Sequence, residues 1–491
     1  MTAFFTDLRY ALRQIRLAPG FSVIAILALA LGIGANSAIF SMLDAVVLRA
    51  LPYEAPDHLM MVFEDATAIG FAKNTPAPAN YIDWRAQNHV FTDMASTRGR
   101  TMSITGDGIP EQLYGLGVTP NFFSVLGVRP LMGRTFTEEE DRNSAQVVVI
   151  SYGFWQRRYA GNPSVLNRSI LLNDVRYTVI GVMPRDFVYR DHDREFWIPI
   201  NVTPAFRAMR GSHFLSVVAR LKPGVTLQAA SEEMAAIATR LKQQYPDQNR
   251  YSGAVVVPIK EDVLGTSRTI LLVLMVAAGC VLLIACANLA SLLLSRAVAR
   301  KRELAVRAAL GAGRGRLVRQ TVTEGALLSL VGGAFGLALS VTGMRVLERL
   351  VPLGLPTTAR PTVDLRLLGF TLILSLFTGV LFSIVPAVQT ARVSLNETLK
   401  QGGRAGSDVQ SQRTRDVLVV LEVAAALVLL IGAGLMIQTM ANLRAVDLGF
   451  ESDHLVTMRT ALGPKYNDAV KRLAYYERVL QRTAALPGVD V

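Results

Sequence analysis

Five separate apolar stretches constrain this chain more than any other feature. They cover residues 21–43, 270–294, 326–344, 367–388 and 417–437. A hydrocarbon core about 30 Å thick needs about 20 mostly apolar residues per helix, and each stretch meets that demand. The chain is also 51% hydrophobic and only 18% charged, which is too apolar for an ordinary soluble enzyme. We therefore predict an α-helical protein that crosses the membrane at these five places.

The first stretch has a second interpretation, because Arg9, Arg13 and Arg16 precede it as they would precede the apolar part of a signal peptide. Its apolar core exceeds the roughly 7–15 residues of that part. We favour a transmembrane helix at 21–43, with a cleaved leader as the alternative.

The basic residues predict the orientation of the spans. They gather in three regions: Arg9, Arg13 and Arg16; Arg296, Arg300, Lys301, Arg302, Arg307, Arg314 and Arg316; and Arg392, Lys400, Arg404, Arg413 and Arg415. All three fall on one side if every stretch spans, and cytoplasmic loops carry such an excess of arginine and lysine. We expect a multi-pass protein of the bacterial cytoplasmic (inner) membrane with a cytoplasmic N-terminus. Residues 44–267 and 442–491 then face outward, while 295–317 and the linker 389–416 face the cytoplasm.

The segment before the first span has its own pattern. Phe4, Leu8, Leu12 and Ile15 recur at helical spacing while the arginines fall on another face, which predicts an amphipathic helix over residues 1–20 on the cytoplasmic leaflet. A merely solvated basic leader is the alternative. Within the spans, Glu422 is a candidate functional carboxylate, but its place near the helix end favours snorkelling or local pairing. Asn288 can hydrogen-bond between helices, which is packing rather than chemistry.

The long segment between the first two spans predicts an α+β domain outside the membrane. Candidate strands with apolar or β-branched enrichment lie at residues 58–64, 146–151, 169–173, 177–182, 214–221 and 254–259. Thr226 is a suitable N-cap for a helix over 227–241, and the order strand, helix, strand indicates a ferredoxin-like βαβ unit. Residues 106–198 are interpreted as a β-rich insertion. Its aromatic group at Tyr152, Phe154, Trp155 and Tyr159 could bind a ligand, although core packing of a short helix is the better interpretation.

The sequence shows few residues for chemistry. Both cysteines, Cys280 and Cys286, lie in one apolar run, so a disulfide framework is excluded. The scattered histidines lack metal-ligand spacing, and no Gly-x-x-x-x-Gly-Lys-[Ser/Thr] motif is present to hold nucleotide phosphates. The net charge of +13 accompanies no nucleic-acid-binding signature. We therefore predict no metal, no cofactor, no nucleic-acid partner and no enzyme activity of its own, and we attribute the basic flanks to anionic lipid.

Several motifs resemble one known family, the MacB-like and FtsX-like ABC permeases. The most specific is ACANLASLLLSRAVARKRELAVRAALGAGRGRLVRQTVTEGALLSLVGG at 285–333. It joins a span, a basic segment, a Gly-Ala-Gly break and the next span. YIDWR at 81–85, SYGFWQRRYAGNPSVLNRSI at 151–170, YTVIGVMP at 177–184 and LKQGGR at 399–404 support it. The opening residues are similar to the duplicated permeases of the acidobacterial type.

The resemblance implies a partner and a place where it docks. In this family the cytoplasmic link between spans two and three contacts a separate ABC ATPase, which assigns ATPase coupling here to Arg300, Arg302, Glu303, Arg307, Gly311 and Gly313. The residues themselves are consistent with a short docking helix, because Glu303 and Arg307 are a favourable i,i+4 pair and Gly311 can end a helix. The alternative is that the basic link only anchors the spans. A periplasmic adaptor or lipoprotein is a further expected partner.

A weak internal repeat fits the duplicated subgroup. PDHLMMV at 56–62 recurs as SDHLVTM at 452–458, each shortly after a span. The fifth span is then expected to start a second copy, with 442–491 as an incomplete second outer domain, so that the chain looks truncated. The permease repeats are expected to form a dimer or pseudo-dimer.

Three functions compete at this point. The leading one is the permease of an exporter or mechanotransmission complex, in which a separate ATPase drives movement of the outer domain. The alternative is an FtsX-like regulator of a cell-wall hydrolase, and the third is a nonfunctional fragment. The β-rich insertion favours the exporter-like branch, and the sequence does not indicate a substrate.

Overall fold

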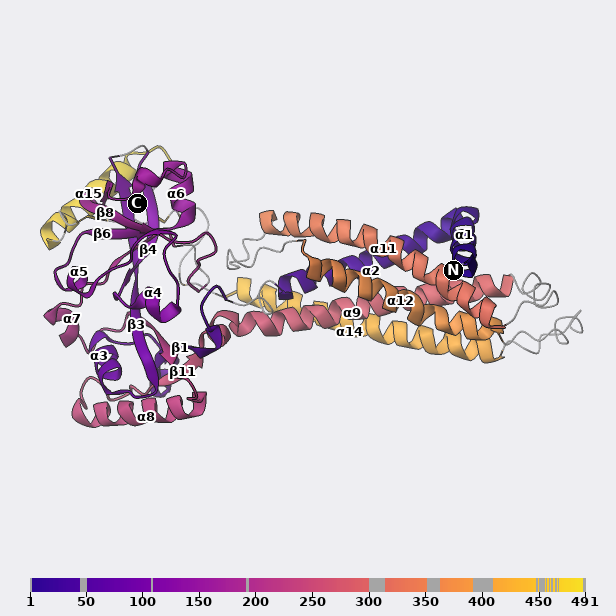
Figure 1. The fold of residues 1–491 in the computed structure, drawn as a ribbon, viewed down its shortest axis with the longest axis horizontal. Coiled ribbons are helices and arrows are strands. Elements are labelled where there is room, and N and C mark those ends of the chain that lie inside the picture. The colour runs from indigo at the N-terminus through magenta and orange to yellow at the C-terminus, as the bar shows by residue number, and fades with distance from the viewer. Residues whose placement is uncertain are drawn as a thin grey trace, which may run out of the picture. The chain divides into compact units, whose positions relative to one another are not determined.

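The chain divides into two compact units. The computed structural model describes residues 2–44, 51–106, 109–190, 194–299, 314–350, 363–391, 409–446 and 468–488, with isolated residues between 449 and 466 (Figure 1). A helical unit comprises Met1–Arg49, Thr266–Leu355 and Ala359–His454, and a sheet domain comprises Ala50–Gly265, Pro356–Thr358 and Leu455–Val491. The predicted coupling segment 295–317 and the linker 389–416 lie mostly outside the described residues.

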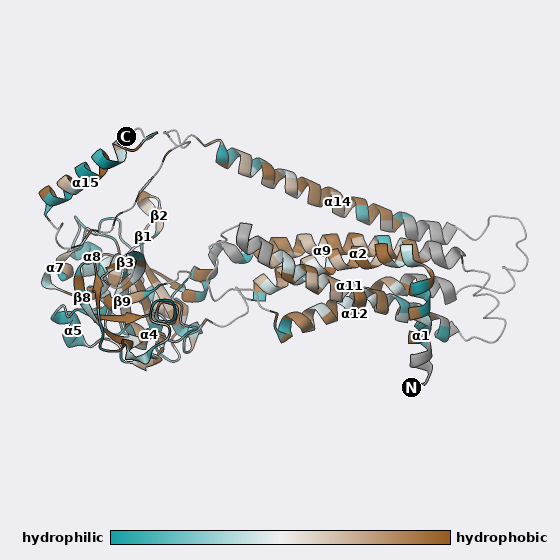
Figure 2. Cartoon of the chain, turned by 90° about the horizontal axis from the view of Figure 1, so that it is seen from above, coloured by the Kyte–Doolittle hydropathy of each residue, from teal (hydrophilic) through white to brown (hydrophobic). Residues whose placement is uncertain are grey.

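The helical unit contains the long apolar helices. It is built from α1 (Thr2–Leu17), α2 (Pro19–Leu43), the part of α9 (Ile259–Ala299) that follows Gly265, α11 (Arg314–Leu350), α12 (Leu365–Ala391) and α14 (Val409–Arg444). Five segments are long and apolar enough to cross a membrane: Pro19–Leu43, Arg268–Leu293, Val318–Met344, Leu365–Ile384 and Val419–Arg444. In Figure 2, which colours the cartoon by hydropathy, these helices are largely brown, the colour of hydrophobic residues. The predicted α-helical membrane protein is confirmed.

Glycines allow α2 and α11 to pack backbone against backbone. A Cβ atom placed on Gly34 would lie 2.8 Å from the carbonyl oxygen of Gly336, and one on Gly336 would lie 2.8 Å from that of Ala30. Small residues give membrane helices this close approach, because packing rather than hydrophobic burial holds them together. Ser37 on α2 also hydrogen-bonds Thr371 on α12 at 2.9 Å.

The N-terminal helix α1 forms where an amphipathic helix is predicted, and it packs partly polar positions against α11. Its buried positions are Asp7, Ala11 and Gln14, whereas Leu12 is 46% exposed. Asp7 accepts a hydrogen bond from Nε of Arg319 on α11 at 2.6 Å. The buried face of α1 is therefore determined by its contact with α11 as well as by the spacing of its apolar residues. The helix ends at Leu17, and Pro19 opens α2, where a missing N–H costs nothing.

The sheet domain is organised around a ferredoxin-like core. Its elements are β1 (Leu59–Ala66), α3 (Pro78–Gln87), β3 (Phe91–Thr105), β10 (Ser216–Leu221), α8 (Leu227–Gln244) and β11 (Val255–Pro258). The strand order is β11-β1-β10-β3, with every neighbouring pair antiparallel. Helix α3 thus joins two parallel strands on either side of β10, and α8 joins two on either side of β1. This is the split βαβ arrangement of ferredoxin-like domains, and Thr226 caps α8 as predicted.

Both helices of this core cover one face of the sheet. Trp84 of α3 and Met234 of α8 are buried there against Met60 and Val217 of the strands. On the opposite face Met61 and Val218 pack against α4 (Phe122–Leu126), including Phe123. The alternation of buried side chains follows the two-residue period of a strand.

The predicted insertion lies between β3 and β10. It contains β4 (Glu111–Val118), α4, β5 (Met132–Gly133), α5 (Glu138–Arg142), β6 (Val147–Ile150), α6 (Tyr152–Tyr159), β7 (Ser169–Leu172), β8 (Val175–Val182), β9 (Phe196–Pro199) and α7 (Pro204–Ala208). These strands extend the sheet from β3 in the order β4-β9-β6-β8-β5, while β7 pairs with β3 and β8. Phe154, Trp155 and Tyr159 are buried in its core, which confirms core packing for the aromatic group.

Shorter elements complete the description. A 3-10 turn (Pro56–His58) precedes β1, β2 (Phe71–Asn74) pairs with β1, and two more turns occupy Thr67–Ile69 and Pro163–Val165. Near the C-terminus, α15 (Ala469–Ala484) belongs to the sheet domain, and its N-cap is Asp468.

Candidate functional site

The residues assigned to ATPase coupling lie between α9 and α11. Arg300, Arg302, Glu303, Arg307, Gly311 and Gly313 all fall outside the described residues. Helix α9 ends at Ala299 and α11 begins at Arg314. Their role therefore remains a prediction, and the structure directs attention to contacts in the described parts of each unit.

The first such contact is formed by Tyr53, on the chain segment between α2 and β1. Its hydroxyl donates to the carbonyl oxygen of Val188 at 2.8 Å and accepts from the backbone N–H of Arg190 at 3.2 Å. Tyr53 is buried, and this burial raises the pKa of its hydroxyl above the ordinary value. The group therefore stays neutral and keeps its proton for the bond to Val188.

The second contact is made by Arg190 on the same loop, which follows β8. Nη2 of Arg190 lies 2.7 Å from Oδ2 of Asp262, and Nη1 donates to Oγ of Ser216 on β10 at 3.2 Å. Asp262 belongs to the first turns of α9, just before the break at Gly265. Arg190 has a φ of +59°, a left-handed conformation that costs energy for any residue with a side chain.

Together these residues form a connector clamp, defined as Tyr53, Val188, Arg190 and Asp262. Tyr53 lies on the segment that comes from the first span, and Asp262 lies on the segment that enters the second. Both segments are fastened to one loop of the insertion.

Within the helical unit, the first two spans are also tied to each other. Asn36 of α2 is buried, and its Nδ2 donates to the carbonyl oxygen of Ala278 on α9 at 2.8 Å. The same group donates to the carbonyl oxygen of Gly32 at 2.9 Å. An amide buried among apolar helices is held strongly in place by such bonds, because water is not available to replace them.

A buried carboxylate in the ferredoxin-like core is structural rather than catalytic. Glu64 is fully buried, and its Oε1 accepts from the backbone N–H of Ala77 and from Nδ2 of Asn80, each at 2.8 Å. Its Oε2 lies 2.9 Å from Nδ1 of His213 and accepts from Ser252 at 3.2 Å. Every lone-pair direction is occupied, so no oxygen is left for a substrate. In the described residues no group of three metal-ligating side chains occurs.

The sequence analysis did not identify the connector clamp. Tyr53 and Arg190 are 137 positions apart, and neither stands in a motif. A polar aromatic residue in the segment after one span and an acidic residue in the segment before the next are weak signals that could have directed attention to them.

Two family models match the chain. Residues 22–237 match the MacB-like periplasmic core domain, and residues 275–395 match the FtsX-like permease C-terminal domain. The first match begins within α2, includes the insertion and all of the ferredoxin-like core except β11 and the end of α8, and stops inside α8. The second includes most of α9, α11 and α12.

Curated relatives agree with these matches. The macrolide export ATP-binding/permease protein MacB of Chromobacterium violaceum is 30% identical over 280 residues, which is 57% of this chain and 42% of the relative. The probable syringafactin export ATP-binding/permease protein SyfD of Pseudomonas syringae pv. tomato is 26% identical over 303 residues, or 61% of this chain and 44% of the relative. The chain thus spans less than half the length of these relatives.

Solved structures give a weaker similarity. The periplasmic region of MacB from Actinobacillus actinomycetemcomitans aligns with a TM-score of 0.33 at 16% identity, covering 43% of this chain and 92% of that structure. The extracellular domain of the ABC-type transporter YknZ aligns with a TM-score of 0.30 at 13% identity, covering 40% of this chain and 99% of that domain.

The two family models fall in the expected order, a MacB-like domain between the first spans and an FtsX-like region over the spans that follow. Five candidate spans and the split βαβ sheet domain agree with that order. The chain belongs to the family of MacB-like and FtsX-like ABC permeases and is a membrane component of an ABC-type system.

Proposed function

We propose that this chain is the permease subunit of an exporter or mechanotransmission complex, in which a separate ABC ATPase drives movement of the sheet domain. The connector clamp is the observation that carries the proposal. It fastens the segments from the first two spans to one loop, so a change in the spacing of those spans acts on the insertion. The chain itself contains no motif that holds nucleotide phosphates.

The proposed orientation follows the basic residues. The N-terminus and the segment 295–317 lie in the cytoplasm, where the ATPase is, and residues 51–267 lie outside the inner membrane. Residues Arg300, Arg302, Glu303, Arg307, Gly311 and Gly313 form the ATPase contact. The curated relatives are named as ATP-binding/permease proteins, which supports an ATPase as the partner.

The ATPase contact is tested with Arg300→Glu/Arg307→Glu in the complete complex. The double variant should insert normally and lose affinity for the ATPase, because each arginine contributes about 1.5–3 kcal/mol if its partner is desolvated. Lys400→Glu/Arg404→Glu, with the same charge change in the other basic linker, is the matched control. Pull-down and stimulated ATP turnover are measured. Unchanged affinity and turnover in the double variant would show that the segment is only an anchor.

Movement of the sheet domain is tested by hydrogen exchange of residues 51–265 with and without nucleotide. Wild-type complex should show nucleotide-dependent protection in this domain, and Asp262→Ala should lose that response while ATP turnover continues. Co-purification with a cell-wall hydrolase, together with a sheet domain that ignores nucleotide, would favour regulation of that hydrolase instead.

A further inference from the structure

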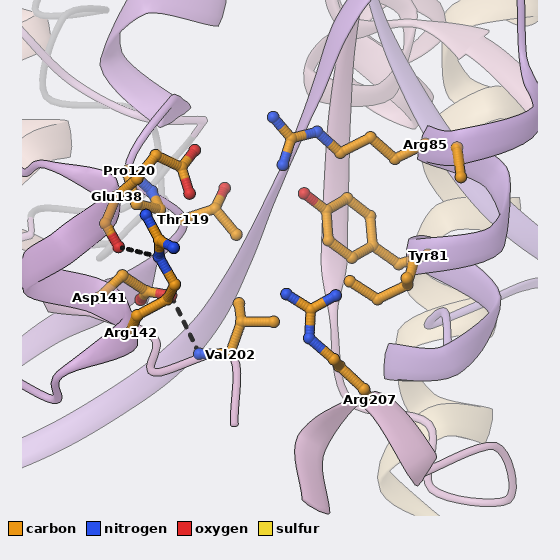
Figure 3. A pocket seen from close by; sticks show the side chains of 11 residues that line it. Tyr81, Arg85, Thr119, Pro120, Glu138, Asp141, Arg142, Val202 and Arg207 are labelled. Atoms are coloured by element: carbon orange, nitrogen blue, oxygen red, sulfur yellow. Dashed lines mark hydrogen bonds between the residues drawn. The ribbon is translucent and has the colours of Figure 1, made fainter. Parts of the chain in front are cut away.

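A cavity of about 520 Å³ lies in the sheet domain, where the ferredoxin-like core meets the insertion. Its volume is within the range of small-molecule sites. Tyr81, Ile82, Arg85 and Ala86 of α3 and Arg207 of α7 line it together with Thr119, Pro120, Glu138, Asp141, Arg142 and Val202 (Figure 3). The cavity plays no part in the connector clamp.

The charged side chains of the cavity are not equivalent. Nε of Arg85 donates to Oδ1 of Asp93 at 2.9 Å, so this guanidinium already has a carboxylate. The carboxylate of Asp141 is buried and accepts from the backbone N–H groups of Asn201 at 2.8 Å and Val202 at 3.0 Å. The Arg85 guanidinium and the Asp141 carboxylate therefore already have partners within the protein.

Two arginines remain available. Among the described contacts, the guanidinium of Arg207 has no hydrogen-bond or ion-pair partner, and that of Arg142 has only a long bond of 3.4 Å to the backbone carbonyl oxygen of Glu138. Figure 3 shows Arg142 and Arg207 on opposite sides of the cavity with Val202 between them. The carboxylate of Glu138 interacts electrostatically with Arg85, which leaves the guanidinium of Arg207 without a carboxylate partner among the described residues.

Apart from Thr119, the rest of the lining is mostly apolar. Ile82, Ala86, Pro120 and Val202 contribute aliphatic surface, and the buried Tyr81 completes this wall. The Tyr81 hydroxyl donates to the carbonyl oxygen of Met94 at 3.1 Å, so it is occupied elsewhere. Such a lining suits a ligand with one apolar body and a small number of charged atoms.

We propose that this cavity binds an amphipathic organic anion, whose carboxylate or phosphate is held by Arg207 and whose apolar body lies against Ile82 and Val202. Guanidinium groups match both oxyanions with paired N–H donors. The site joins α3 of the core to α5 of the insertion, so a bound anion links these two parts of the domain. The proposal does not depend on the ATPase contact.

The test uses the full chain in nanodiscs of a zwitterionic lipid, with empty nanodiscs as the background. The probes are naphthyl phosphate, naphthoate and, as the cationic counterpart of the same shape, naphthylmethylamine, each measured by equilibrium dialysis at low salt. We expect a single saturable site for one or both anions and none for the amine. Saturable binding of naphthyl phosphate alone, or of naphthoate alone, would identify which oxyanion the site accepts.

Substitutions in the lining test separately whether binding depends on the charge of Arg207 and on the open volume of the cavity. Arg207→Gln should weaken anion binding by about tenfold or more, the effect of removing one charge-assisted bond, and Arg207→Lys should restore part of it. Ala86→Trp, at an exposed position, should block the cavity without a change in charge. Arg129→Gln, an exposed arginine outside the lining, is the matched control. The proposal is wrong if no anion saturates, if the amine binds equally well, or if both Arg207→Gln and Ala86→Trp leave binding unchanged.

Discussion

Asn288 on α9 donates a hydrogen bond from Nδ2 to Oε1 of Glu422 on α14 at 2.8 Å. The sequence analysis singled out both residues for different reasons, and the structure brings them together. In the candidate span of α14 none of the described side chains is buried. This bond therefore fixes the contact of α14 with the second span and explains how a carboxylate is tolerated in an apolar helix.

We predict that the Asn288–Glu422 pair contributes about 0.6 kcal/mol to the association of α14 with α9, the average for such bonds in membrane proteins. A double-mutant cycle with Asn288→Ala and Glu422→Ala measures it by unfolding in mixed micelles. The coupling energy isolates the pair from changes in packing. Additive effects of the two substitutions would show that the bond contributes nothing.

The close contact of α2 and α11 gives a prediction with an internal control. Gly336→Ala should destabilise the helical unit by about 1–3 kcal/mol, the usual cost of overpacking, because its Cβ would meet the backbone of Ala30 and Gly34. Gly343→Ala on the same helix has open space around the new atom. It should be neutral or slightly stabilising, since alanine favours helices. Equal effects of the two substitutions in the same unfolding assay would contradict the packing argument.

The strands of the sheet domain show which elements the sequence pattern can predict and which it cannot. All six predicted strands are present, because their apolar enrichment marks β1, β6, β7, β8, β10 and β11. The fifteen-residue β3 was missed, since its sequence FTDMASTRGRTMSIT alternates poorly and contains a glycine. Its strand conformation comes from pairing with β10, β4 and β7. That pairing joins residues far apart in the chain, which local propensity does not report.

The candidate sites were less predictable than the spans. Runs of apolar residues reveal spans, because the length and composition of a segment are enough to show that it can cross a membrane. The connector clamp depends on a loop residue, Arg190, meeting Tyr53 and Asp262 from two distant segments. The anion cavity likewise requires α3 and α5 to face each other. Neither follows from spacing along the chain.

The clamp predicts a local change in stability. Arg190→Ala should increase hydrogen exchange in the first turns of α9, since Asp262 would keep a largely buried charge without its partner. Arg190→Gly removes the same pair but relieves the positive φ, so it should cost less in overall stability while raising exchange equally. Mass spectrometry of peptides covering 259–265 gives the exchange rates. Protection that survives both substitutions would mean that the ion pair does not hold this turn.

The pair of His213 and Glu64 predicts how the stability of the sheet domain depends on pH. The hydrogen bond to Glu64 raises the pKa of His213 above its ordinary value, although partial burial opposes the shift. In the unfolded chain His213 should titrate near its reference value of about 6.5.

Because the folded pKa is the higher one, the folded state binds the proton more tightly. The stabilisation is therefore fully present below about pH 6.5 and is lost as the pH rises through the folded pKa. We expect wild type to be more stable than His213→Gln at pH 6, by about 1.5–3 kcal/mol for a bond between charged groups. That difference should shrink steadily toward pH 9. Denaturant unfolding of the sheet domain within the full chain, followed by hydrogen exchange at several pH values, measures it. Glu64→Gln should abolish the pH dependence of the difference, because the charge that holds the proton is then gone. If the difference between wild type and His213→Gln instead grows with pH, the histidine is held in its neutral form and the assignment of the ion pair is wrong.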